Sequence, residues 1–252
     1  EKKYGKPKGK YVTLENGDFF RDKELKARLS DELGRTVVEL AEYLGIKKPK
    51  KILAVGVGNV MMTADSLGPE CVKKIGPIAE SGKSGGFSLC TVTPGVIGVT
   101  GIESFDLVYG VVQTIKPDLI IAIDTLAAAD AGRLSRTFQL STAGLSPGGG
   151  VKNNRPPLNF ETLNTPVIAV GVPLVIYALG LAKAVLSQSN AAIKAVGADA
   201  KSPDRNGNQG AAAICQTLKD MIVTVKDINV AVNECAEVIS DGINAASRGF
   251  LL

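Results

Sequence analysis

Two aspartates follow apolar segments of the chain, in positions where their carboxyl groups could do acid–base chemistry. Asp65 lies in the turn VGVGNVMMTADSLGPE after the apolar run 51–58, and Asp124 follows the very apolar run LIIAI. Taken singly, Asp65 fits the N-cap of the next helix, and Asp124 fits a hydrogen-bonding residue of a loop. If the two runs are neighbouring parallel strands, about 4.8 Å apart, both carboxyls reach one crevice. Carboxyls that share a site differ in pKa, so one can hold a proton while the other acts as the base.

The composition restricts this chain to such groups. Its 252 residues include no His, which excludes Ser-His-Asp and Cys-His catalysis and HExxH zinc chemistry unless a partner supplies the imidazole. The four cysteines, Cys71, Cys90, Cys215 and Cys235, lack CxxC spacing and are typical of reduced thiols in a reducing compartment. We therefore expect no metal and no cofactor.

The turn before Asp65 also contains glycines in a G-x-G spacing, which invites a phosphate-binding interpretation. Gly56 and Gly58 match that pattern, but Met61 occupies the position of the third glycine and no Walker lysine follows. The sequence therefore disfavours a nucleotide site. Asn59, in the same turn, is a candidate substrate-binding residue.

A second glycine-rich turn, TPGVIGVTGIES, leads from a strand into a helix. Gly95, Gly98 and Gly101 allow backbone N–H groups to face a substrate oxygen, and Glu103 is placed to cap the helix. The alternative is a tight loop that needs glycines for steric reasons. Lys152 and Arg155 offer cations near the same rim, with a solvated loop as the alternative.

These residues need a scaffold of alternating strands and helices, and the hydrophobic pattern predicts one. Apolar residues at three- and four-residue spacing predict helices, and short runs rich in branched residues predict buried strands. We therefore expect an α/β fold with three layers, a mainly parallel sheet with helices on both faces. The expected helices are 22–45, 67–80, 105–115, 173–186 and 227–246, and the expected strands are 11–15, 51–58, 87–92, 119–123, 136–141 and 166–172.

The charge distribution defines one further segment. Residues 1–10 hold five Lys and one Glu, so the net charge of +4 lies there and the remaining residues balance at 24 against 24. We expect a basic N-terminal arm over 1–10 and a single α/β domain over 11–252, with a mobile insertion at 187–213. No motif for reading nucleic acid, no apolar signal region and no membrane-spanning run appears, which indicates a cytoplasmic protein.

Six blocks of this sequence resemble one known family, the spore germination proteases, which degrade small acid-soluble spore proteins. The similarity runs from about Gly9 to Ala246. The blocks are VGVGNVMMTADSLGPE, TPGVIGVTGIES, IKPDLIIAIDTLAA, AGLSPGGGVKNNRPPL, TPVIAVGVP, and MIVTVKDIN with VISDGINAA.

The resemblance implies an atypical aspartic endopeptidase that needs no metal, is made as a zymogen and assembles as a homotetramer in the spore core of a sporulating bacterium. It places the two proposed catalytic aspartates at Asp65 and Asp124. The family's fold resembles that of the hydrogenase-maturation peptidases. Small acid-soluble spore proteins are the implied substrates, with no direct nucleic-acid contact.

Three departures from the family pattern leave alternatives open. The family's TPD is here Thr63-Ala64-Asp65, its VPTVVDA is VPLVIYA over 172–178, and the segment that carries the propeptide is absent from this chain. One alternative is a catalytically degenerate scaffold or regulator with the same fold. The other is a metal-dependent maturation peptidase that uses Asp65 and Asp124 as ligands, although two acids without His form a weak transition-metal site.

Overall fold

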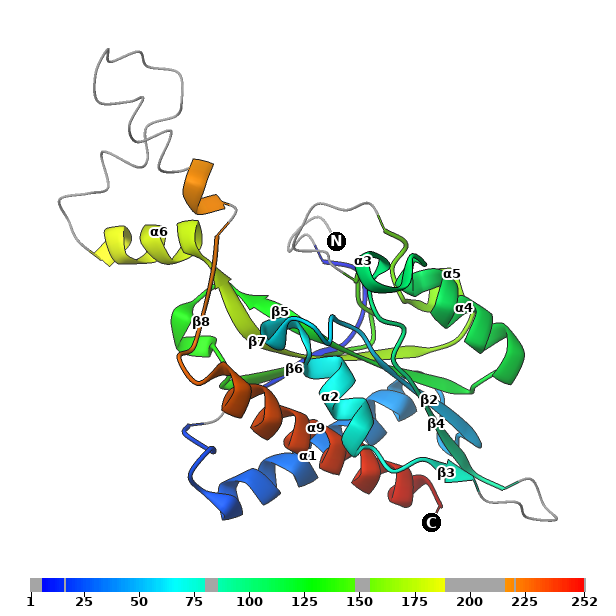
Figure 1. Ribbon diagram of the computed structural model, residues 1–252. Helices are drawn as coiled ribbons and strands as arrows, with labels where there is room; N and C mark the ends of the chain where they lie inside the picture. Colours follow the sequence, from blue (N-terminus) through cyan, green and yellow to red (C-terminus); the bar gives the residue numbers. More distant parts are fainter. Residues whose placement is uncertain are drawn as a thin grey trace.

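The computed structural model describes residues 6–15, 17–79, 86–147, 155–188, 216–219 and 221–251. Its centre is an eight-stranded sheet in the order β1-β6-β7-β5-β2-β4-β3, with β8 paired to β7 (Figure 1). The strands are β1 (Tyr11–Glu15), β2 (Lys51–Gly56), β3 (Ile78–Ala79), β4 (Ser88–Val92), β5 (Leu119–Ala128), β6 (Thr137–Ser141), β7 (Val167–Tyr177) and β8 (Ile222–Thr224).

Helices cover both faces of this sheet, so the expected three-layer α/β fold is confirmed. The four central strands, β4, β2, β5 and β7, run parallel to one another. The strands β1, β3, β6 and β8 pair antiparallel around them, so the whole sheet is mixed. The helices are α1 (Lys23–Tyr43), α2 (Leu67–Lys74), α3 (Ile97–Thr100), α4 (Ser104–Ile115), α5 (Phe160–Leu163), α6 (Ala178–Gln188) and α9 (Ile228–Leu251), with short 3-10 helices η1 (Thr63–Asp65) and η2 (Ala131–Arg133).

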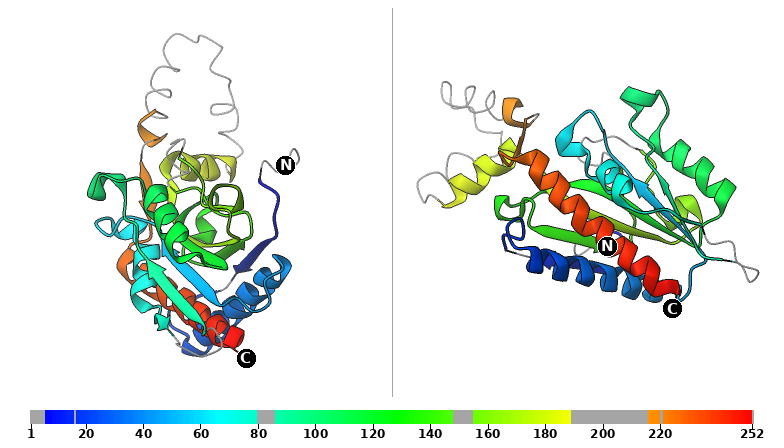
Figure 2. Two further views of the ribbon diagram at one scale, coloured as in Figure 1. Left: turned by 90° about the vertical axis from the view of Figure 1, so that its right-hand side faces the viewer. Right: turned by 60° about the horizontal axis from the view of Figure 1, so that its bottom comes forward.

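The larger core lies between the sheet and the helices α1, α2 and α9. The α1 helix begins as its sequence predicts, because the Asp22 side chain accepts hydrogen bonds from the backbone N–H groups of Glu24 and Leu25. The chain leaves this helix through Gly45, whose φ of +81° favours glycine. α1 packs along α9 on this face (Figure 2). The α1 side chains that enter the core are Leu29, Leu33, Val37 and Leu40.

A smaller core lies on the opposite face. Val108 and Val112 of α4 and Leu163 of α5 pack there against sheet residues such as Leu53 and Ile120. Because side chains alternate along each strand, the odd-numbered residues of β5 from Leu119 to Ile123 face the α1 side and the even-numbered ones face the α4 side. This places Asp124 on the α4 face of the sheet.

Several expected elements differ in extent from the observed ones, among them two helices. The helix expected over 67–80 ends at Lys74, because Gly76 and Pro77 follow and cannot continue it. The helix expected over 173–186 is wrong in its first part, since the strand β7 continues to Tyr177 and the helix starts at Ala178.

The proline inside β7 is accommodated by an irregularity of the sheet. Leu126 pairs with Pro173, but the next residue of β5 pairs with Val175, so the register shifts at this point. A bulge is one of the few places where a strand tolerates a residue without an N–H. Beyond it, β8 adds hydrogen bonds to the end of β7.

Some expectations concern residues outside the described ranges. The insertion expected at 187–213 lies outside them except for its first two residues, which belong to α6. The division into an arm over 1–10 and one domain over 11–252 stays a prediction. Of the three cysteines described, none forms a disulfide, and Cys215 is outside the described ranges. No helix in the described part of the chain has both the length and the apolarity needed to cross a membrane.

Candidate active site

Asp124 lies inside β5, at the point where the neighbouring strand β2 has ended. Gly56, the last residue of β2, pairs with Ile123, and β5 continues past it to pair with β7 alone. The side chain is only 8% exposed. Burial, and after it the negative charge of Asp65, raise the pKa of Asp124 to about 7, although the hydrogen bond from the backbone N–H of Thr125, 2.8 Å from Oδ1, opposes the rise. Asp124 is thus a mid-strand residue, not the strand-end residue that the sequence predicted.

Asp65 reaches the same place from the turn that follows β2. It is the last residue of η1, and its half-buried carboxylate accepts a hydrogen bond of 3.1 Å from the backbone N–H of Asn59. Burial raises the pKa of Asp65, and this hydrogen bond opposes the rise. The simpler interpretation as a helix cap is wrong, because Ser66 occupies the N-cap of α2 and no side chain caps that helix.

The glycines of this turn serve close packing. A Cβ atom on Gly58 would lie 2.0 Å from the main-chain oxygen of Asp65, and Gly58 has a φ of +131°. A Cβ atom on Gly56 would lie 2.3 Å from the main-chain oxygen of Gly68 at the start of α2. The G-x-G spacing therefore lets the turn and α2 press against the end of β2, which accounts for it without a phosphate.

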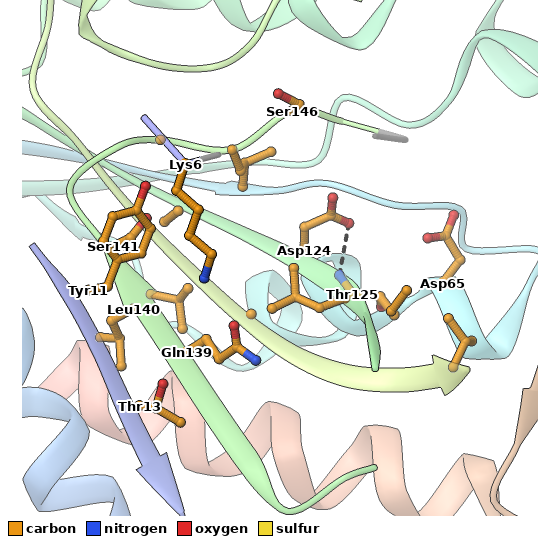
Figure 3. A pocket seen from close by; sticks show the side chains of 18 of the residues that line it. Lys6, Tyr11, Thr13, Asp65, Asp124, Thr125, Gln139, Leu140, Ser141 and Ser146 are labelled. Atoms are coloured by element: carbon orange, nitrogen blue, oxygen red, sulfur yellow. Dashed lines mark hydrogen bonds between the residues drawn. The ribbon is translucent and has the colours of Figure 1, made fainter. Parts of the chain in front are cut away.

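Both aspartates line one cavity of about 770 Å³ on the α4 face of the sheet (Figure 3). The negative charge of Asp65 contributes to the raised pKa of Asp124, which indicates that the two carboxyls lie close enough to interact electrostatically. The cavity extends from them over β7 and β6 to β1 at the sheet margin. Its polar lining includes Lys6, Tyr11, Thr13, Thr125, Gln139 and Ser141.

The other predicted site residues are not among those that line this cavity. Gly95 and Gly101 have φ values of +71° and +72°, so the tight-loop alternative accounts for both, and Gly98 has open space around it. Glu103 stands at the N-cap of α4 but makes no capping bond, and its carboxylate pairs with Arg155 at 3.4 Å.

Asn59 and Lys152 are the remaining residues of the predicted substrate-binding set. Asn59 acts through its backbone on Asp65, while its side chain accepts a hydrogen bond from the backbone N–H of Met61. Lys152 is outside the described residues. The substrate-binding roles of the predicted set stay predictions.

Sequence reasoning missed several residues that the fold brings to the cavity. Lys6 belongs to the basic arm, yet it lines the cavity and lies 5.2 Å from the ring centroid of Tyr11. Gln139 and Thr13 come from β6 and β1, strands assigned to the fold alone. The Thr125 hydroxyl is buried and has no hydrogen-bond partner among the described residues. Of these residues, only Thr125 could have been found from the sequence, because it directly follows Asp124. The others reach the cavity through the pairing of distant strands.

The two carboxyls that line the cavity differ in burial. Asp124 is the more deeply buried, and its pKa lies near neutrality, so it retains a proton up to a higher pH than an ordinary carboxyl does. Two carboxyls in one desolvated site titrate as a coupled pair, and the singly protonated form contains both an acid and a base. In the described part of the chain, no cluster of three or more His, Cys, Asp or Glu could hold a metal ion.

Comparison with known proteins gives consistent matches. The family model described as germination protease matches residues 1–218. Germination protease of Caldanaerobacter subterraneus is 37% identical, with 98% of this chain and 80% of that protein covered. The protein of the same name from Priestia megaterium is 32% identical, with 96% of this chain and 78% of that protein covered.

A match among solved structures is weaker. A [NiFe] hydrogenase maturation protease, HycI from Thermococcus kodakarensis, is 17% identical with a TM-score of 0.32, over 50% of this chain and 75% of that chain. This level of similarity supports no inference about the site. The family model over residues 1–218, together with relatives covered over about four fifths of their own length, shows that the chain belongs to the germination protease family of peptidases.

Proposed function

We propose that this peptidase is an aspartic endopeptidase that hydrolyses peptide bonds with a water activated between Asp65 and Asp124. The observation that supports the proposal is the shared cavity, which holds two carboxyls of different burial on one side of the sheet. Following the family resemblance, its substrates are small acid-soluble spore proteins in the cytoplasm of the spore core. The zymogen stage and the homotetramer belong to the same proposal.

In the proposed mechanism the two carboxyls have different roles, which their different burial supports. Asp124, the more buried, holds the proton and donates it to the carbonyl oxygen of the scissile bond as the tetrahedral intermediate forms. Asp65, the less buried and held by the Asn59 N–H, is ionised and takes a proton from the attacking water. Collapse of the intermediate then needs a proton on the leaving nitrogen, which Asp65 supplies. As the C–N bond breaks and the C=O of the acid product forms, Asp124 takes back the proton of one hydroxyl of the intermediate, so the pair again holds one proton, on Asp124.

The test compares cleavage of a purified small acid-soluble spore protein by the wild type, Asp65→Asn and Asp124→Asn. An amide neither takes nor gives the proton, so each variant should lose at least about 100-fold in kcat. Asp22→Asn is a matched control, because Asp22 caps α1 away from the cavity and Asn caps nearly as well.

Melting temperatures recorded alongside separate chemistry from folding. Near-normal turnover in either aspartate variant removes that residue from the mechanism. Inactivity that follows from unfolding does the same. A wild type that binds the spore protein without cleaving it supports the non-catalytic alternative.

A further inference from the structure

Four residues on four adjacent strands form a row across the sheet that ends at Asp124. Thr13 of β1 pairs with Gln139 of β6, Gln139 pairs with Gly171 of β7, and Gly171 pairs with Asp124 of β5. Paired residues of adjacent strands point to the same face of a sheet. The row therefore places Gln139 two strands from Asp124, on the face that contains the cavity.

The surroundings of Gln139 agree with this placement. Its sequence neighbours Phe138 and Leu140 are buried in the core on the α1 side, so the Gln139 side chain points to the α4 side. Gln139 is half-buried and lines the same cavity as the two aspartates (Figure 3). Within the described residues its carboxamide makes no hydrogen bond, so the acceptor and the donors of this group face the cavity unpaired.

The interval between Gln139 and Asp124 is apolar. Strands lie about 4.8 Å apart, so two strand spacings separate the two backbones by about 10 Å. Gly171, between them, has no side chain, and the Leu126 side chain lies against it, since a Cβ on Gly171 would be 2.7 Å from Leu126 Cγ. Both line the cavity. The floor is thus apolar, with a carboxyl group on one side and a carboxamide on the other.

We propose that Gln139 is a substrate-binding residue that pairs with a peptide unit of the substrate main chain, about three residues away from the bond cleaved between the aspartates. A carboxamide has one C=O acceptor and an NH₂ donor, which match the N–H and C=O of a peptide. This contact recognises the main chain irrespective of side chains, so it sets the register of an extended, unstructured substrate. The inference rests on the proposed function, because it needs a peptide at Asp124.

The experiment measures binding and turnover separately. In the Asp124→Asn background, which is expected not to cleave, binding of a fluorescein-labelled small acid-soluble spore protein is followed by anisotropy with and without Gln139→Leu. Loss of the paired hydrogen bonds should weaken Kd roughly 10-fold. In the wild-type background, KM of Gln139→Leu should rise by a similar factor while kcat changes less. Gln113→Leu, an exposed position of α4 outside the cavity lining, is the matched control and should change neither.

A second measurement keeps the test valid if Gln139→Leu loses stability. A substrate peptide is N-methylated at one main-chain nitrogen at a time, and each form is bound to the Asp124→Asn protein and to its Gln139→Met derivative. One N-methyl position should weaken binding to the protein that retains Gln139 and have little effect when Met replaces it. Additive effects at every position would overturn the inference.

The two proposals fail in different ways. Unchanged Kd and KM in the Gln139 variants, with Asp124→Asn inactive, would overturn the role of Gln139 alone. Full turnover by Asp124→Asn, with binding still dependent on Gln139, would overturn the aspartate mechanism and leave Gln139 as a peptide-binding residue.

Discussion

Gly58 lies so close to Asp65 that a Cβ atom on the glycine would be 2.0 Å from the main-chain oxygen of the aspartate. The backbone N–H of Asn59 then donates to that same oxygen at 2.9 Å and to the Asp65 carboxylate at 3.1 Å. The turn thus holds the carboxyl through its backbone, and only a glycine allows this approach.

Gly58→Ala should therefore disrupt the turn. The φ of +131° and the clash with Asp65 together predict that the free energy of unfolding falls by at least about 2 kcal/mol. Because the turn holds the Asp65 carboxyl, peptidase activity should be lost as well. Denaturant unfolding checks the first effect and peptide cleavage the second. Gly110→Ala is the control: it is exposed within α4 with open space around it, and should stabilise by about 0.5–1 kcal/mol. Equal stability of both variants would contradict the strain at Gly58.

Asp124→Asn should stabilise the protein at neutral pH while it abolishes turnover. The folded-state pKa of Asp124, about 7, lies above the ordinary value of 3.8, so the folded state binds its proton more tightly than the unfolded state does. Ionisation of Asp124 therefore lowers the free energy of unfolding as pH rises from about 4 to about 7. Asn does not ionise, so the variant does not lose stability in this way. The melting temperature of the variant minus that of the wild type should grow over this window and then level off. A difference that does not vary with pH would show that burial does not penalise the Asp124 carboxylate.

Turnover should follow a bell-shaped pH profile. Because the active species has one proton on the pair, kcat/KM should rise as the first proton leaves and fall as the second leaves. The pKa of Asp124 places the falling limb near pH 7. Initial rates on a spore-protein peptide between pH 3 and 9 check this. A rate that still climbs at pH 9 would show that an ionised Asp124 is the active form.

Chelation should leave activity unchanged. The chain contains no His, and carboxylates alone make a weak site for transition metals. Dialysis against EDTA, followed by the cleavage assay and metal analysis of the purified protein, checks the expectation. Loss of cleavage that zinc or nickel restores would favour the metal-dependent alternative.

Local patterns in the sequence predicted the parts of the fold that depend on local physics. Asp22, the leucine stripe of α1 and Gly45 identify that helix and both of its ends, because capping and periodicity act over a few residues. The apolar runs of β2 and β5 predicted buried parallel strands. The expected pairing of these strands predicted that Asp65 and Asp124 lie near one another. The strands do pair, and both aspartates line one cavity.

Features that depend on distant pairing were not predictable in this way. The strand β7 continues through Pro173 only because a register shift against β5 and the added strand β8 accommodate it. Gln139 and Thr13 reach the cavity because β6 pairs with β7 and with β1, and no local pattern encodes those partners. In the glycine-rich turn 93–104, the positive φ values of Gly95 and Gly101 agree with the tight-loop alternative, and the substrate-binding role of the turn stays a prediction.

The packing of α1 along α9 has a consequence for how the protein is made. The chain makes α1 long before α9, and the core side chains of both helices, such as Leu33 and Ile243, lie in one cluster with the sheet. A nascent chain that has not yet released α9 from the ribosome therefore exposes the apolar α1 face of its sheet. Completion of the core waits for a contact of very long sequence separation, which slows folding and favours aggregation of unfinished chains. A chaperone that binds this exposed face during synthesis should therefore raise the yield of folded protein.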